Sequence, residues 1–317
     1  MKKTTIFGFW AGAGFVFIMA PYFLPTYWLM ILSEILIMGL FALSFNLLLG
    51  YTGLLSFGHG AFFGIGAYTA AMLLKYNFEN ILLIFPLGIF MAVLASSIVA
   101  YFSVKMDEIF FAMITLGFGM LFYTIGHNWT GVTGGSDGLP IFNPPFFSIF
   151  GLNFGFYTPK SMYFLIITSF FMGVSFLWSV INSPFGLMLK SLRENKNRVM
   201  FVGGDVKRMR GFAFILSGAV AGMAGVLFGI FNNMATPEFM HWSFSARPVI
   251  MSILGGAGTF LGPLVGAAVF FVLEQLIIKF TENWMFFLGL IMVLIVLFFP
   301  KGILGTILGY IGKDEKI

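Results

Sequence analysis

The stretch WLMILSEILIMGLFALSFNLLL, residues 28–49, contains a single ionisable side chain, Glu34, and is otherwise almost entirely apolar. An α-helix needs about 20 apolar residues to cross the hydrocarbon core of a bilayer, which is about 30 Å thick. The stretch therefore predicts a transmembrane helix.

Runs of the same kind recur along the chain, at residues 6–24, 53–74, 81–104, 109–126, 161–181, 211–231 and 284–300. Hydrophobic residues make up 59% of the chain and charged residues 9%, whereas a soluble domain is about 45–50% apolar and about 25% charged. We expect an all-α fold, a polytopic transmembrane helical bundle that forms a single domain over residues 1–317. Lys2 and Lys3 precede the first run, which we interpret as a retained helix rather than a cleaved signal peptide.

The region 248–278 is too long for one ordinary span and too short for two full ones. Its centre, LGGAGTFLGP at residues 254–263, would interrupt a helix because glycine and proline both disfavour a helix interior. We expect two short helices that meet at a glycine-rich break. The total is then between eight and ten membrane passages, some of them short or broken.

The basic residues predict the orientation, because cytoplasmic loops carry an excess of Lys and Arg. Seven of the 17 lie between residues 190 and 210: Lys190, Arg193, Lys196, Arg198, Lys207, Arg208 and Arg210. This loop should be cytoplasmic. If 248–278 crosses twice, ten passages place both termini in the cytoplasm and leave 127–160 as the largest outer loop, with short interfacial structure.

The segment 183–206 predicts an amphipathic helix on the cytoplasmic side. Ser183 and Pro184 resemble an N-cap followed by proline at the first helical position, and Gly203 with Gly204 supplies a stop. Such a helix has two interpretations. It either lies on anionic lipid, or it is a coupling helix that docks on a cytoplasmic partner and transmits its motion.

Several motifs favour the coupling helix. SPFGLMLKSLRENKNR at 183–198, continuing through VGGDV at 202–206, resembles the coupling motif of branched-chain amino-acid ABC-transporter permeases. Further stretches resemble the same family in order along the chain: SFNLLLG at 44–50, LSFGHGAFFGIGAY at 55–68, MITL at 113–116, TGGSDGL at 133–139 and LGGAGTFLGP at 254–263. TGGSDGL and the ending PKGILG at 300–305 resemble the LivM-type subunit more than its LivH-type partner. Val199-Met200 and Gly204 depart from the usual family pattern.

The resemblance implies a heteromeric importer in the prokaryotic cytoplasmic (inner) membrane. A second homologous permease would complete the pathway, two cytoplasmic ATPase subunits would hold ATP and Mg, and an extracytoplasmic solute-binding protein would deliver leucine, isoleucine or valine. This chain would bind no cofactor and no nucleic acid. Besides these protein subunits, it would contact membrane lipid. The residues expected to couple to the ATPase are Leu189, Arg193, Glu194, Asn195 and Gly203.

Glycine-rich stretches have two interpretations. Small residues four apart let helices approach closely, which we expect for Gly218, Gly222, Gly225 and Gly229. Around 53–68 and 254–266 the glycines accompany polar groups and helix breaks, which mark the pathway in many transporters. The candidate pathway residues are Asn46, Ser56, His59, Thr115, Gly255, Gly256 and Thr259, although His59 could instead hydrogen-bond a neighbouring helix.

The sequence also excludes several chemistries. It has no cysteine, its histidines are far apart, and no GxxxxGK[ST] loop is present to cradle a nucleotide phosphate. A membrane enzyme would need a cluster of catalytic polar residues, and an ion-coupled secondary transporter would need buried ion ligands. Glu34 and Glu274 form no chain of carboxylates for a proton relay, and they could contact a partner chain. An importer of urea or short amides remains an alternative.

Overall fold

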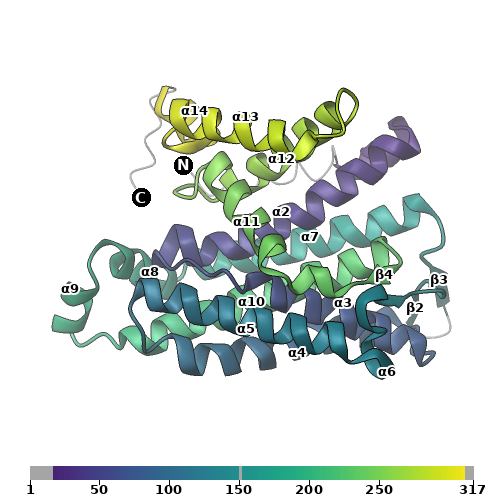
Figure 1. The fold of residues 1–317 in the computed structure, drawn as a ribbon, viewed down its shortest axis with the longest axis horizontal. Coiled ribbons are helices and arrows are strands. Elements are labelled where there is room, and N and C mark those ends of the chain that lie inside the picture. The colour runs from purple at the N-terminus through teal and green to yellow at the C-terminus, as the bar shows by residue number, and fades with distance from the viewer. Residues whose placement is uncertain (1–16, 150–151, 311–317) are drawn as a thin grey trace.

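The computed structural model describes residues 17–310 apart from 150–151, and the fold is a bundle of long helices (Figure 1). Four helices precede the largest loop: α2 (Thr26–Thr52), α3 (His59–Lys75), α4 (Ile81–Ser103) and α5 (Glu108–Asn128). The helices after that loop are α7 (Pro159–Ile181), α8 (Pro184–Glu194), α9 (Lys196–Phe201), α10 (Val206–Phe231), α11 (Trp242–Gly255), α12 (Gly262–Ile278), α13 (Trp284–Phe298) and α14 (Gly302–Tyr310).

Among the described residues, six segments are long and apolar enough to cross a membrane. Five are α2, α4, α5, α7 and α10, and the sixth, Phe286–Ile307, runs from α13 across a short interruption into α14. The shorter helices α3, α11 and α12 pack beside them. The all-α polytopic bundle predicted from the sequence is therefore confirmed. Of the expected first span, 6–24, residues 17–23 are helical and residues 6–16, like both chain ends, lie outside the described residues.

Two predicted helix boundaries were wrong. The run 53–74 is helical only from His59, because Gly53, with a φ of 74°, ends α2 and the chain continues without helix to Gly58. The predicted break in 248–278 is confirmed between α11 and α12, but α11 begins at Trp242. Its first turns contain Ser243, Ser245 and Arg247, which lower the hydropathy of a segment that is nevertheless helical.

The bundle has two distinct ends (Figure 1). At the α8 end lie α8, α9 and the turn between α4 and α5. At the loop end, residues 129–158 form the short elements α6 (Thr130–Thr133), η1 (Gly135–Asp137), β1 (Leu139–Pro140), β2 (Phe146–Ile149) and β3 (Leu152–Gly155). β2 pairs with β3, and β1 pairs antiparallel with β4 (Met234–Ala235), which is followed by η2 (Pro237–Met240). The expected short structure in the largest loop is thus confirmed.

Helix α10 is the packing centre, with α2, α3 and α4 around it. Its glycines permit this, because a Cβ added at Gly225 would lie 1.8 Å from the carbonyl oxygen of Phe63, and one at Gly222 would lie 2.2 Å from the Cβ of Ala92. Lipid tails are as apolar as leucine, so the hydrophobic effect does not drive helices together in a membrane. Close approach of the backbones stabilises the bundle instead, through van der Waals contacts. The predicted packing role of the α10 glycines is confirmed.

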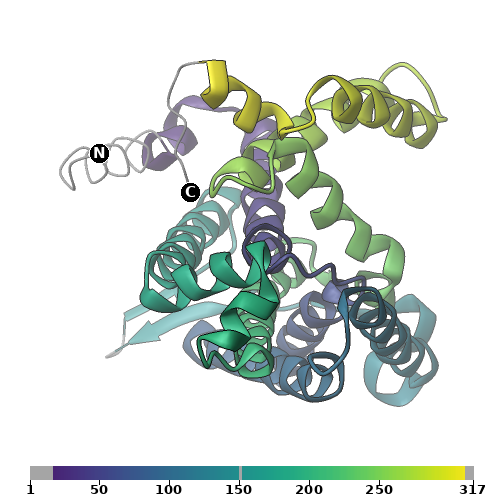
Figure 2. The same ribbon diagram turned by 90° about the vertical axis from the view of Figure 1, so that its left-hand side faces the viewer.

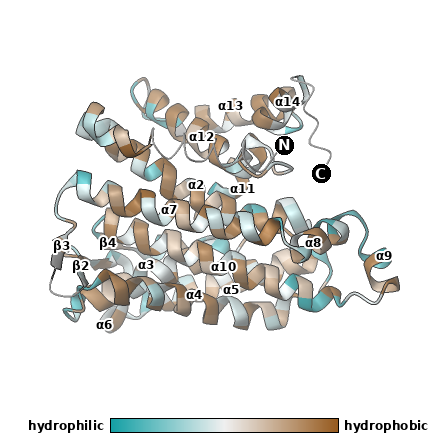
Figure 3. Cartoon of the chain, turned by 180° about the vertical axis from the view of Figure 1, so that it is seen from behind, coloured by the Kyte–Doolittle hydropathy of each residue, from teal (hydrophilic) through white to brown (hydrophobic). Residues whose placement is uncertain are grey.

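Hydrophobic residues predominate along most of the helices, as a bilayer requires (Figure 3). Large hydrophobic side chains are exposed along α4, α5 and α13, among them Ile98, Met113 and Leu297. Seen from the α8 end, α12, α13 and α14 form a layer on one side of α2, away from α4 and α5 (Figure 2). The chain is therefore an integral membrane protein.

We expect Gly225→Ala to destabilise the bundle. The new methyl group would overlap the backbone of α3, and overpacking costs about 1–3 kcal/mol, or about 2–4 °C of melting temperature per kcal/mol for a chain of this order of size. The measurement is thermal unfolding in detergent. Gly117→Ala is the matched control because no heavy atom lies within 4 Å of its added Cβ. Equal melting temperatures for the two variants would contradict the packing role.

Candidate functional site

The segment between α7 and α10 folds as two helices rather than the one amphipathic helix that the sequence suggested. The Ser183 hydroxyl accepts from the Gly186 amide (3.3 Å) and caps α8, with Pro184 at its first position, as predicted. Asn195 then leaves the helical conformation, and its side chain accepts from the Arg198 amide (3.0 Å) to cap α9. An asparagine that can bond the backbone in this way competes with helix continuation. Gly203, at a φ of 88°, follows the end of α9.

One face of α8 holds it against the bundle. Leu189 and Leu192 are buried, and the Arg193 guanidinium donates a hydrogen bond to the carbonyl oxygen of Gly50, near the end of α2. That carbonyl belongs to the last turn of α2, where helical partners run out. Of the predicted coupling residues, Leu189 and Arg193 thus connect α8 to α2.

The opposite face of α8 and α9 is exposed and apolar. Leu187, Met188, Met200, Phe201 and Val202 are between 49% and 90% exposed, and we call them the apolar patch. Leu187, Met188 and Val202 line a hollow of about 560 Å³, which Glu194, Asn195 and Gly203 also line. Exposed apolar patches with polar rims mark surfaces that bind a partner or a membrane. Three predicted coupling residues therefore lie beside this surface.

At the α8 end, two ion pairs join α9 and α10 to the start of α5. Lys196 Nζ lies 2.7 Å from Asp107 Oδ1, and Arg210 Nη2 lies 3.0 Å from Glu108 Oε1. Arg210 is buried, whereas the Asp107 carboxylate is exposed. The hydrogen bond from Lys196, reinforced by its charge, holds the pKa of the Asp107 carboxyl below its ordinary value. Motion of α9 is thereby linked to α5.

His59 begins α3 in the middle of the packed core. The ring stacks on Phe41, with centroids 5.5 Å apart, and its Nε2 lies 3.0 Å from the Ser44 hydroxyl. Ser44 donates its own proton to the Phe41 carbonyl (2.7 Å), and Ser217 donates to the Ser44 carbonyl. Since both hydroxyl protons are engaged, Nε2 is the donor and Nδ1 the free acceptor. The hydrogen bonds to α2 and α10 agree with the structural interpretation of this residue.

The other predicted pathway residues fall into two groups. Ser56 and Thr115 lie near His59, since the added Cβ of Gly58 would meet the carbonyl oxygen of Thr115. Asn46, Gly255, Gly256 and Thr259 lie where the break between α11 and α12 meets α2, and the Asn46 amide donates to the Thr259 carbonyl (3.1 Å). Within the described residues, Asn46 Oδ1, Ser56 Oγ and His59 Nδ1 have no hydrogen-bond partner. These seven residues remain a predicted pathway set.

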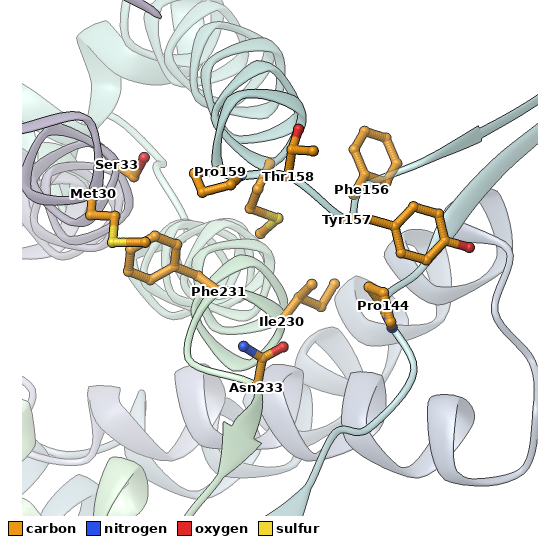
Figure 4. A pocket seen from close by; sticks show the side chains of 11 residues that line it. Met30, Ser33, Pro144, Phe156, Tyr157, Thr158, Pro159, Ile230, Phe231 and Asn233 are labelled. Atoms are coloured by element: carbon orange, nitrogen blue, oxygen red, sulfur yellow. The ribbon is translucent and has the colours of Figure 1, made fainter. Parts of the chain in front are cut away.

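A small cavity opens at the loop end (Figure 4). It has a volume of about 220 Å³ and lies between the ends of α2, α7 and α10. No ionisable side chain other than the Tyr157 phenol lines it; the lining residues are Met30, Ser33, Pro144, Phe156, Tyr157, Thr158, Pro159, Met162, Ile230, Phe231 and Asn233. Such a lining offers no charged partner to a charged substrate.

A larger cavity, of about 800 Å³, lies between α5, α11, α12 and α13, and the sequence reasoning missed it. Arg247 and Glu274 line it. Glu274 was recognised as an intramembrane ionisable residue, but Arg247 was overlooked because 242–247 was not taken as part of a membrane segment. An arginine followed directly by an apolar run was the available signal.

These features define an integral membrane protein with an exposed apolar surface at one end of its bundle. The family model described as the permease component of the branched-chain amino acid transport system matches residues 27–296, and the chain belongs to this family.

Individual relatives agree with this assignment. The high-affinity branched-chain amino acid transport system permease protein LivM of Escherichia coli is 29% identical, over 83% of this chain and 66% of the relative. LivH of Salmonella typhimurium is 24% identical, over 84% of this chain and 91% of the relative. A probable LivM of Methanocaldococcus jannaschii is 27% identical over 41% of this chain. This chain therefore spans slightly less than two thirds of the Escherichia coli LivM, and the LivM-type resemblance is confirmed. No solved structure matches the chain.

We expect α9 to loosen as the pH falls, because protonation of Asp107 removes its pairing with Lys196. A carboxyl with a lowered folded-state pKa contributes stability above the ordinary aspartate pKa of about 3.9 and loses it as the pH falls through the lower folded value. A nitroxide on Phe201→Cys, in a chain otherwise free of cysteine, would report greater mobility below about pH 4. In Asp107→Asn the label should be mobile at every pH, and a pH response that persisted there would contradict the assignment.

Proposed function

We propose that this chain is the membrane-spanning permease subunit of an ATP-driven importer of branched-chain amino acids: leucine, isoleucine and valine. The observation that carries the proposal is the apolar patch at the α8 end in a chain of this transport family. A secondary transporter has no need of such an exposed surface. The relatives of this chain are named as transport permeases, which favours a transporter over a membrane enzyme.

The proposed assembly contains this chain, a second homologous permease, two ATPase subunits and an extracytoplasmic solute-binding protein. ATP and Mg would bind to the ATPase subunits, and this chain would hold no cofactor and contact lipid but no nucleic acid. The names of the LivM and LivH relatives, two permease proteins of one transport system, support the pairing.

We propose that the α8 end faces the cytoplasm of a prokaryotic cell and that both termini lie on that side of the inner membrane. The seven basic residues between 190 and 210 support this orientation, because short cytoplasmic loops are enriched in Lys and Arg. The ATPases would then press on the apolar patch, and Arg193 and Lys196 would pass the motion to α2 and to the turn before α5.

The substrate follows from the family, and urea or a short amide is the second candidate. Buried polar groups normally have hydrogen-bond partners. The unpartnered polar atoms of Asn46, Ser56 and His59 therefore support the hypothesis that the region around them rearranges during transport.

The deciding experiment is uptake of labelled leucine into proteoliposomes that hold the complete transporter, with binding protein outside and ATP inside. We expect uptake to require both, and to be lost when Arg193 and Glu194 are reversed in charge without loss of assembly. Labelled urea, supplied with its own binding protein, tests the second candidate. Uptake by this chain alone, driven by an ion gradient without ATP, would contradict the proposal.

We also expect Phe201→Asp to weaken binding of the ATPase subunits about thirtyfold or more. An aromatic anchor at the centre of an interface contributes about 2 kcal/mol or more, which is roughly thirtyfold in affinity. Co-purification and ATPase titration on the solubilised complex would measure the loss. Phe280→Asp is the matched control, because Phe280 is 86% exposed, close to the 90% of Phe201, but lies between α12 and α13. Equal effects of the two changes would show that α9 is not the docking site.

A further inference from the structure

The cavity of about 800 Å³ is built largely by α11 and its neighbours. Tyr123 of α5 and Leu288, Gly289 and Met292 of α13 line it on either side of α11, which Figure 2 shows between those two helices. The side chains of α11 and α12 complete it together with the segment before α11; these are Glu238, Phe239, His241, Ser243, Phe244, Arg247, Ile250, Phe270 and Glu274. Phe228, near the end of α10, also contributes.

Opposite charges face this cavity without forming an ion pair. In the part of the chain that the structure describes, the only ion pairs involve other residues, so Arg247 and Glu274 are apart although both line the space. Arg247 interacts electrostatically with Glu274 and with Glu34 of α2. A charged group among membrane helices is costly and usually has a partner or serves a substrate pathway.

The guanidinium of Arg247 is held in place by an aromatic ring. Its Cζ lies 5.0 Å from the centroid of Phe244, one turn earlier on α11, within the range of a cation–π interaction. Among the described residues, no protein group accepts a hydrogen bond from the N–H groups of this guanidinium. Arginine presents those groups as a fork that matches a carboxylate. The arrangement suits an anionic group of a ligand.

Apart from Tyr123, Glu238, His241 and Ser243, the rest of the lining is apolar. Phe244, Ile250, Phe270, Leu288 and Met292 come from three helices and surround the space next to the two charges. An amino acid with a branched aliphatic side chain has three matching parts: a carboxylate for Arg247, an ammonium group for Glu274 and an apolar body for these residues. A neutral amide or urea would leave both charges unmatched, which penalises its binding.

A second cavity extends this one along α11. It measures about 270 Å³, shares Ile250 and Met292 with the larger cavity, and is otherwise lined by Ile253, Leu254, Val293, Val296 and Leu297. Because α11 and α13 both end at the α8 end of the bundle, the apolar cavity lies on that side of the charged one. The two cavities together form a continuous path along α11, with charged side chains in the first cavity and an apolar lining in the second.

We propose that the Arg247–Glu274 cavity binds the transported amino acid as a zwitterion, with Arg247 on the carboxylate and Glu274 on the ammonium group. The inference rests on the proposed function and names the substrate-binding site within it. It also accounts for a preference for amino acids over urea or amides.

The test uses photo-leucine, a diazirine analogue with an intact zwitterion, delivered to the complete reconstituted transporter and activated by light. We expect the label on peptides of α11, α12 and α13, competed by leucine but not by 4-methylpentanoate or isoamylamine, which each lack one charge. Arg247→Gln and Glu274→Gln should each lower labelling and leucine uptake about tenfold or more, since each leaves one charge of the ligand unpaired. The yield of assembled complex should not change.

Matched controls neutralise charges outside the cavity. Lys279→Gln removes a positive charge just after α12 and Glu282→Gln removes a negative charge a few residues later, and both residues are exposed. Neither should alter labelling. A double charge swap, Arg247→Glu with Glu274→Arg, should restore part of the labelling that Arg247→Glu alone loses, because the zwitterion can bind in reverse.

Distinct results would overturn the proposal. Unchanged labelling in Arg247→Gln, with wild-type uptake intact, would remove this site and leave the importer in place. Label on α2 and α3 instead would move the site to the region around His59. Separation of the two permease subunits in Arg247→Gln would mean that Arg247 pairs with the partner chain. A wild-type transporter that takes up no leucine would overturn the proposed function and, with it, this site.

Discussion

The structure depends on one constraint, which is that a peptide backbone among lipid chains has no water to bond. Irregular backbone at membrane depth is therefore stable only inside the protein or beside a water-filled cavity. The non-helical stretch 53–58 meets this condition because Gly58 lies against the backbone of α5 at Thr115. The break between α11 and α12 meets it as well, since Gly256 packs against Gly302 and Asn46 bonds the Thr259 carbonyl.

Close helix packing follows from the same constraint. To enclose those breaks, the helices around them must approach until backbone meets backbone, which is why small residues line α10 and the contact between α11 and α12. A Cβ on Gly266 would lie 1.8 Å from the Met251 carbonyl oxygen. Helices with bulky exposed side chains, α4, α5 and α13, are left for the surface. The bundle thus has a rigid centre at α2, α3 and α10, and the α12–α14 layer lies on one side of it.

The two candidate functional regions differ in how far the sequence could predict them. The segment around Leu189 and Arg193 was recognisable, since its capping residues and spacing are local. Its division at Asn195 and the bond from Arg193 to Gly50 were not, because they depend on α2. His59 was visible as a rare polar residue, yet its engagement with Ser44 and Ser217 joins three helices. Arg247 was missed because its segment is too polar to be recognised as part of a membrane helix without its neighbours.

By itself the sequence determined the class of protein, the family and most helix boundaries. Each of these follows from local properties: runs of apolar residues, capping side chains, glycine breaks and short motifs along the chain. Only the tertiary structure decided that α10 is central, that Arg193 holds α8 to α2, and that Arg247 and Glu274 face one cavity across two helices. The physical reason is that a helix fixes the spacing of its own side chains, whereas its rotation and depth against other helices are set by packing between residues far apart in sequence.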